Sequence, residues 1–99
     1  MILEAVMLNV KDDLERDFET AFKQASSIIS SMNGYLSHEI HRCIETQGKY
    51  LLLVRWNSLE AHTIGFRGSP EYQEWKKLLH HFYDPFPIVE HFEEVELNH

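Results

Sequence analysis

Residues 50–56 constrain the fold of this chain more than any other stretch. Successive side chains of a β-strand point to opposite faces of the sheet, so a strand with one solvated face alternates apolar and polar residues. Residues 51–54 read Leu-Leu-Leu-Val and do not alternate, which is typical of a strand covered on both faces. A chain of 99 residues supplies helices for one face only. We therefore expect a second copy of the chain to cover the other face, in a homodimer.

The remaining segments predict the element order β-α-β-β-α-β in one domain, residues 1–99. Strands are expected over residues 2–10, 35–44, 50–56 and 88–97. The first helix is expected to begin at Asp12, with Asp12 and Glu15 as a capping box, and to stop at Gly34. The second is capped by Ser58 and, after a break, restarts at Ser69 and Pro70.

This order indicates an α+β, ferredoxin-like fold, a four-stranded antiparallel sheet with its helices on one face. In that arrangement the first and third strands are central, and they are the two strands that are apolar on both faces. The helical spacing of apolar residues predicts which side chains join helices to sheet. They are Phe18, Phe22, Ile28, Ile29 and Leu78.

Composition and charge exclude several classes of function. A net charge of −7 disfavours binding to nucleic acids and to anionic membranes. RNA-recognition motifs share the element order, but residues 51–54 are aliphatic where stacking aromatic side chains would be needed. No apolar run is long enough for a membrane helix, and the first residues lack a basic signal region. With Cys43 as the lone cysteine, we expect a cytoplasmic protein.

Seven histidines raise the question of a metal site, and their spacing argues against one. His38 and His41 are three residues apart on an expected strand, so they face opposite sides. His80 and His81 are adjacent, about 100° apart on a helix. No HExxH motif or paired cysteine and histidine ligands are present. We expect no metal.

Two motifs carry a resemblance to a known family. One is Trp-x-Ser-x-x-Ala-His over residues 56–62, and the other is Ser-Pro-x-Tyr over residues 69–72. Together with Asn9 at the end of the first strand, they resemble the antibiotic biosynthesis monooxygenase family of the dimeric α+β barrel superfamily. The resemblance covers residues 2–95. It implies a homodimer joined through its sheets and a pocket in each subunit between sheet and helices.

The resemblance implies different chemistry in different branches of the superfamily. The haem-degrading branch uses an Asn, a Trp and a His. This chain keeps Asn9, but it has Gly65 and Phe66 where the Trp would be and Trp75 and Lys76 where the His would be. The oxygenase branch needs no cofactor, because its substrate, a phenol, anthrone or quinol, passes an electron to O₂ itself once deprotonated. We expect a cofactor-independent monooxygenase of a small aromatic substrate. The alternative is a non-catalytic dimer that binds a small ligand or haem, with His62, His80 or His81 as the haem ligand.

The expected site combines a base, hydrogen-bond donors and aromatic walls. His62 is the expected base, because the unperturbed pKa of histidine is about 6.5, and Asn9 is expected to hold the resulting oxyanion. The substrate is expected to contact Trp56, Phe66, Trp75 and Tyr83. We expect His62, Asn9 and Trp75 to line one pocket, which a helical break at residues 65–70 opens over the sheet. Packing alone would also explain Trp56 and Trp75, and His91 is expected to be structural or to lie at the dimer rim.

Overall fold

Four antiparallel strands form one sheet in the computed structural model, which describes residues 1–97. The spatial order is β2-β3-β1-β4, so β1 and β3 are central, as predicted. The strands are β1 (Ile2–Asn9), β2 (Tyr35–Arg42), β3 (Lys49–Trp56) and β4 (Val89–Phe92). The helical segments are α1 (Glu15–Ser30), η1 (Ala61–Phe66), α2 (Pro70–Leu79) and η2 (His80–Phe82). The predicted ferredoxin-like α+β fold is confirmed.

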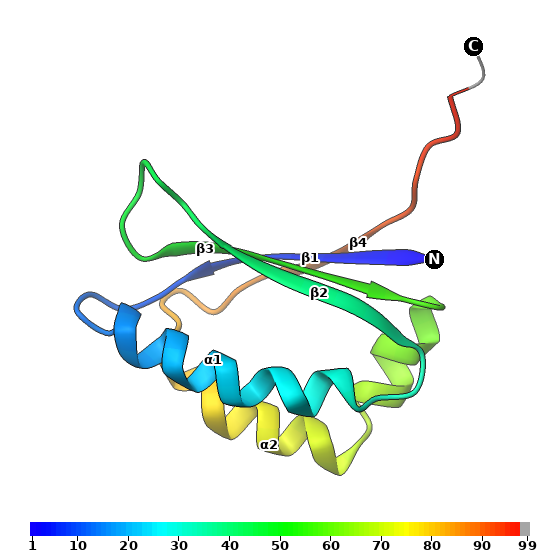
Figure 1. Ribbon diagram of the computed structural model, residues 1–99, viewed down its shortest axis with the longest axis horizontal. Helices are drawn as coiled ribbons and strands as arrows, with labels where there is room; N and C mark the ends of the chain where they lie inside the picture. The colour runs from blue at the N-terminus through cyan, green and yellow to red at the C-terminus, as the bar shows by residue number, and fades with distance from the viewer. Residues whose placement is uncertain (98–99) are drawn as a thin grey trace.

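All helical segments lie on one face of the sheet (Figure 1). On β1 and β3 the buried residues alternate, and the buried ones point toward the helices. The opposite face carries Leu3, Ala5 and Met7 on β1 and Leu51 and Leu53 on β3, which are partly or largely exposed in this single chain. No helix within residues 1–97 is long and apolar enough to cross a membrane.

The helix-facing core is built mainly from aromatic and branched side chains. Of the predicted core, Phe18, Phe22 and Ile29 are fully buried. Ile28 and Leu78 are only partly buried, so their prediction as full core residues is wrong. The neighbouring Leu79 is 0% exposed and occupies the position expected for Leu78. Each consecutive residue is rotated by about 100° around a helix, so a small error in orientation changes which residue is buried.

Most strand boundaries lie within two residues of the prediction, and two predicted boundaries differ by more. Helix α1 begins at Glu15 and not at Asp12, and no side chain caps it. Asp13 adopts a left-handed backbone conformation with φ of 67°, which a helical first turn excludes, so the capping box predicted for Asp12 is wrong. The last strand ends at Phe92, short of the predicted 97, because only β1 is available to pair with it and its register reaches only from Val6 to Leu3.

The segment after β3 is a π-helix, η1, and not the α-helix that was expected. Its widened turn is seen in the bond from the Arg67 N–H to the His62 carbonyl, five residues back. The predicted caps are nevertheless present. Ser58 Oγ accepts from the Ala61 N–H at 3.2 Å, and Ser69 Oγ accepts from the Tyr72 N–H at 3.1 Å to start α2.

Candidate active site

A cavity of about 390 Å³ lies between the sheet and the helices. Its floor comes from β1, β3 and β4, and its walls come from η1, α2, η2 and the segment that leads into β4. Its aromatic lining consists of Tyr72, Trp75, Tyr83 and Phe86. Its ionisable lining consists of Glu4, His62, Arg67, His80 and the phenol groups of the two tyrosines. The cavity therefore combines flat apolar walls with acid–base groups, an arrangement suited to a small aromatic ligand.

Glu4 is the residue that sequence reasoning missed. It lies in the middle of β1 on the helix-facing side, between apolar neighbours, and is only 6% exposed. The indole N–H of Trp56 donates to Glu4 Oε1 at 2.9 Å. Its Oε2 makes no hydrogen bond with any residue from 1 to 97, so it can accept one from a ligand. A buried carboxylate with an open oxygen on a cavity floor is a candidate catalytic group.

Burial raises the pKa of Glu4, while the Trp56 hydrogen bond and the positive charge of Arg67 act in the opposite direction. A raised pKa makes the carboxylate a stronger base than an exposed glutamate. The one sequence signal for this group was a single acidic residue inside the apolar strand at residues 2–10. On strand periodicity Glu4 shares a face with Val6 and Leu8, which is the face that the helices cover in the structure.

His62 is buried beside Glu4 and is 3% exposed. Its ring stacks on the indole of Trp56, with centroids 5.3 Å apart and planes 19° apart. Its Nδ1 lies 2.7 Å from Nε2 of His91, and its Nε2 lies 3.4 Å from Glu4 Oε1. Burial, followed by the charges of Arg67 and His91, lowers the pKa of His62 to about 3. At neutral pH its imidazole is therefore uncharged.

The sheet register brings these groups together. Glu4 on β1 pairs with His91 on β4 and with Val54 on β3, so all three side chains share the helix-facing side. The π-helix holds His62 above this row, and the His62 and His91 rings lie 5.0 Å apart. His91, predicted to be structural or at a dimer rim, is thus hydrogen-bonded to a residue that lines the cavity. We call Glu4, Trp56, His62 and His91 the carboxylate cluster.

The structure brings together three of the predicted site residues. His62, Trp75 and Tyr83 all line the cavity. Burial raises the pKa of the Tyr83 phenol. The break after η1 lets that helix and α2 meet over the cavity, as expected. Phe66 and Trp56 do not line it: they are 2% and 0% exposed and pack behind its wall.

Asn9 lies elsewhere. It shares the uncovered face of β1 with Met7 and lines a different hollow, together with Leu51. The prediction that Asn9 and His62 line one pocket is wrong for this chain. Alternate residues of a strand face opposite sides, and Leu8 takes the helix-facing position at that end of β1. Asn9 instead uses its backbone carbonyl, which accepts from the Asp84 N–H at 2.9 Å.

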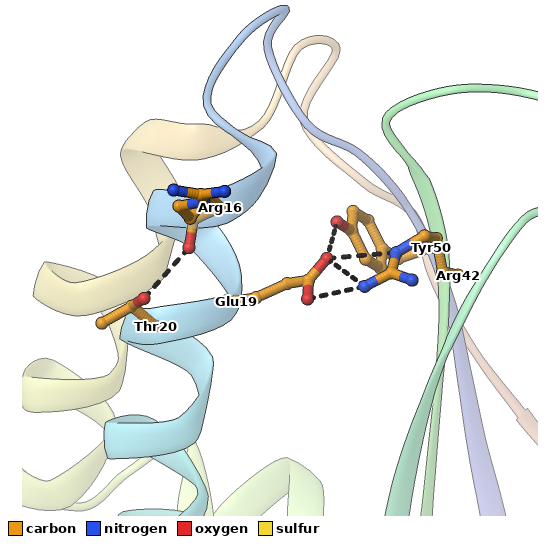
Figure 2. Close-up of polar contacts among 5 residues, drawn as sticks. All are labelled: Arg16, Glu19, Thr20, Arg42 and Tyr50. Carbon is orange, nitrogen blue, oxygen red and sulfur yellow. Dashed lines mark hydrogen bonds and ion pairs between the residues drawn. The ribbon is translucent and has the colours of Figure 1, made fainter.

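A second polar cluster lies between α1 and the sheet (Figure 2). The guanidinium of Arg42 on β2 donates two bonds from Nη2 to Glu19 on α1, at 2.7 and 2.8 Å. The Tyr50 hydroxyl donates to Glu19 at 2.5 Å. Both Glu19 oxygens are therefore occupied. This cluster ties α1 to the strands and offers no open base, unlike Glu4.

The structure also bears on metal binding. Among residues 1–97 there is no group of three or more His, Cys, Asp or Glu side chains that could hold a metal ion. In the carboxylate cluster, Nδ1 of His62 is hydrogen-bonded to His91, and its Nε2 lies 3.4 Å from Glu4 Oε1.

Comparison with known proteins places the chain in a family. The model of the antibiotic biosynthesis monooxygenases matches residues 1–78. The chain belongs to the antibiotic biosynthesis monooxygenase family. It is 61% identical over 95 residues to the uncharacterized protein YczJ of Bacillus subtilis, covering 96% of this chain and 100% of that one. The family assignment agrees with the resemblance seen in residues 56–62 and 69–72.

Solved structures of antibiotic biosynthesis monooxygenases share this fold. A Bordetella bronchiseptica protein assigned to the family is 33% identical, with a TM-score of 0.91 over 96% of this chain and 97% of that one. SnoaB of Streptomyces nogalater, a cofactor-independent oxygenase, is 15% identical, with a TM-score of 0.80 over 97% of this chain and 94% of that one. The similarity to SnoaB therefore shows a shared fold only.

Proposed function

We propose that this protein is a cofactor-independent monooxygenase that oxidises a small phenol, anthrone or quinol with O₂. The observation that carries the proposal is the buried carboxylate of Glu4 on the floor of an aromatic-lined cavity. Family membership and the cofactor-independent activity of SnoaB support it.

Glu4 is the proposed base. It takes the acidic proton of the substrate at Oε2, leaving the substrate as an anion. This assignment differs from the sequence-based expectation of His62, because an imidazole with a pKa near 3 is a weak base at neutral pH. Burial raises the pKa of Glu4 and so brings it closer to the working pH, as in other enzymes that use carboxylates as bases.

The other groups of the site hold the carboxylate and the substrate. The Trp56 N–H bonds to Glu4 Oε1, and the Nε2 of His62 lies close enough to do so when the site tightens around a ligand. Trp75 and Tyr83 form walls against the substrate ring, and the Tyr83 hydroxyl can donate to its oxygen. These walls also exclude water, which strengthens each electrostatic contact.

The substrate supplies the electrons in this reaction. The anion passes one electron to O₂, and the resulting radical and superoxide combine into a peroxide anion. This anion takes back the proton that Glu4 removed and becomes a hydroperoxide. Loss of water from the peroxide leaves a carbonyl on the substrate, so one oxygen atom enters the product and the other leaves in water. An anthrone, for example, would become an anthraquinone.

Oxygen uptake by the purified protein tests the proposal. Anthrones and quinols are supplied as a panel, and wild type is compared with Glu4→Gln and with Glu19→Gln as the matched control. Removal of the base is expected to reduce turnover by about 10²- to 10⁴-fold, while Glu19→Gln keeps the wild-type rate because Glu19 lies outside the cavity. Uptake at the buffer rate for every substrate, or equal rates in wild type and Glu4→Gln, would contradict the proposal.

We also propose that the protein acts as a homodimer joined through the uncovered faces of its sheets. That face carries apolar side chains on both central strands, and no helix of residues 1–97 covers it (Figure 1). A contiguous exposed apolar surface on one side of a sheet is typical of a protein interface. The lone Cys43 supports a cytoplasmic location.

A further inference from the structure

The contact between His62 and His91 has two possible proton arrangements, and they differ in what they present to Glu4. The ring nitrogens lie 2.7 Å apart, so one ring donates and the other accepts. If His62 donates from Nδ1, its Nε2 is an unprotonated acceptor that faces the Glu4 oxygen at 3.4 Å. If His91 donates from Nε2, the single proton of His62 sits on Nε2 and points at that oxygen.

Electrostatics favours the second arrangement. Two acceptors that face each other at 3.4 Å repel, while an N–H that faces a carboxylate at this distance is attracted to its charge. The burial of both partners strengthens this preference, since Glu4 is 6% and His62 is 3% exposed.

We propose that His91 is a positioning residue, whose Nε2–H fixes His62 in the tautomer that points its own Nε2–H at Glu4 and so keeps this carboxylate charged and aimed into the cavity. Its importance for turnover rests on the proposed function, whereas the tautomer does not. His91 reaches His62 from β4, because β4 pairs with β1 in the register that places His91 opposite Glu4. An edge strand thereby controls a group on the cavity floor.

Other charged and titratable groups surround Glu4 and must stay constant in the test. Arg67, which follows η1, lowers the pKa of Glu4 through its positive charge. His80 and Tyr83, which follow α2 in the chain, line the same cavity. The variants described next leave all three in place.

Three variants separate the hydrogen bond from mere packing. His91→Gln keeps an N–H donor near the position of Nε2, and His91→Leu keeps bulk without a donor. His41→Leu is the matched control, because His41 is exposed on β2 and its side chain bonds to Glu39, outside the carboxylate cluster. In each protein, ¹⁵N spectra of the imidazoles report the tautomer of His62, and ¹³C spectra of the carboxyls report the titration of Glu4.

In wild type and His41→Leu we expect His62 to carry its proton on Nε2. His91→Leu is expected to lose this single tautomer and to raise the pKa of Glu4, and His91→Gln is expected to restore both toward wild type. The acid limb of kcat/KM should move with the pKa of Glu4. A proton on Nδ1 in the wild type, or an unchanged tautomer and Glu4 titration in His91→Leu, would overturn the proposal. If no substrate of the panel is oxidised, the proposed function fails and the spectra still decide the role of His91.

Discussion

Glu4 and His91 lie directly opposite each other on β1 and β4, and His62 contacts both from above. The two strands are far apart in sequence, at the beginning and near the end of the chain. Their pairing makes the buried carboxylate and its supporting imidazoles a product of the complete fold. The chemistry of the site is therefore sensitive to changes in the carboxylate cluster and in the sheet that builds it.

Acid should destabilise the protein through His62. The pKa of His62 is about 3 in the folded chain and about 6.5 when unfolded. Below pH 6.5 the unfolded chain binds a proton that the folded chain excludes, so the free energy of unfolding falls by up to about 1.4 kcal/mol per pH unit. Glu4 opposes part of this loss at lower pH, because its raised pKa lets the folded state bind its proton first.

Urea unfolding between pH 7 and pH 4 measures this dependence. His62→Gln should have a shallower fall than wild type, because it removes the group whose protonation favours unfolding. His41→Gln, an exposed histidine on β2, should follow the wild-type curve. Equal slopes for wild type and His62→Gln would show that His62 titrates normally in the folded protein.

Replacement of Trp56 by Phe should weaken the support of Glu4. The substitution keeps a buried ring and removes the N–H that donates to Oε1 at 2.9 Å. The lost bond to a buried charged group should cost about 1–3 kcal/mol of stability. The pKa of Glu4 should rise further, because that bond lowers it in the wild type. Urea unfolding checks the loss of stability, and a ¹³C carboxyl titration checks the rise in the pKa of Glu4. An unchanged Glu4 titration would contradict the prediction for the pKa.

A charge on the uncovered face of the sheet should dissociate the proposed dimer. Leu51→Glu is expected to give a folded monomer of 11.7 kDa in sedimentation at micromolar concentration, because an unpaired charge buried in an interface costs several kcal/mol. Ile64→Glu is the control, since Ile64 is exposed on η1, away from that face. Leu52→Glu should instead unfold the chain, because Leu52 is buried on the helix side. A monomeric wild type would contradict the dimer.

Haemin titration tests the alternative function of haem binding. His62 is 3% exposed and its Nδ1 is bonded to His91, so a haem ligand in this cavity would be expected to come from His80. We expect no saturable Soret shift with the wild type. A stoichiometric haem spectrum that disappears in His80→Ala would favour the haem-binding alternative over the oxygenase.

Truncation in the core should distinguish buried from half-buried helix residues. Phe18→Ala should cost about 3–5 kcal/mol, because Phe18 is 0% exposed and contacts the rings of Phe22 and Tyr50. Ile28→Ala should cost clearly less, since Ile28 is only partly buried. Equal losses in urea unfolding would mean that Ile28 is buried in solution, for example by a partner chain.

The sequence was sufficient to predict features that depend on local patterns. The apolar run at residues 51–54 correctly indicated a central strand, and Ser58 and Ser69 cap helical segments as their positions suggested. Placing side chains around the cavity required long-range information. Asn9 was assigned to the wrong face because the pleat of β1 had not been fixed. The contact of His91 with His62 depends on the register of β4, which its own sequence does not define.

The π-helix has a consequence for how this site can vary among related chains. Its turn holds one residue more than an α-helical turn, so His62 and Arg67 bond across five residues. Deleting one exposed residue of η1, such as Gly65, would leave enough chain for an ordinary helix. Each residue of that helix accounts for about 100° of rotation. His62, before the deletion, and Arg67, after it, would therefore no longer both face Glu4. A one-codon deletion is thus a short genetic route from a chain with a supported carboxylate to one of the same fold without it.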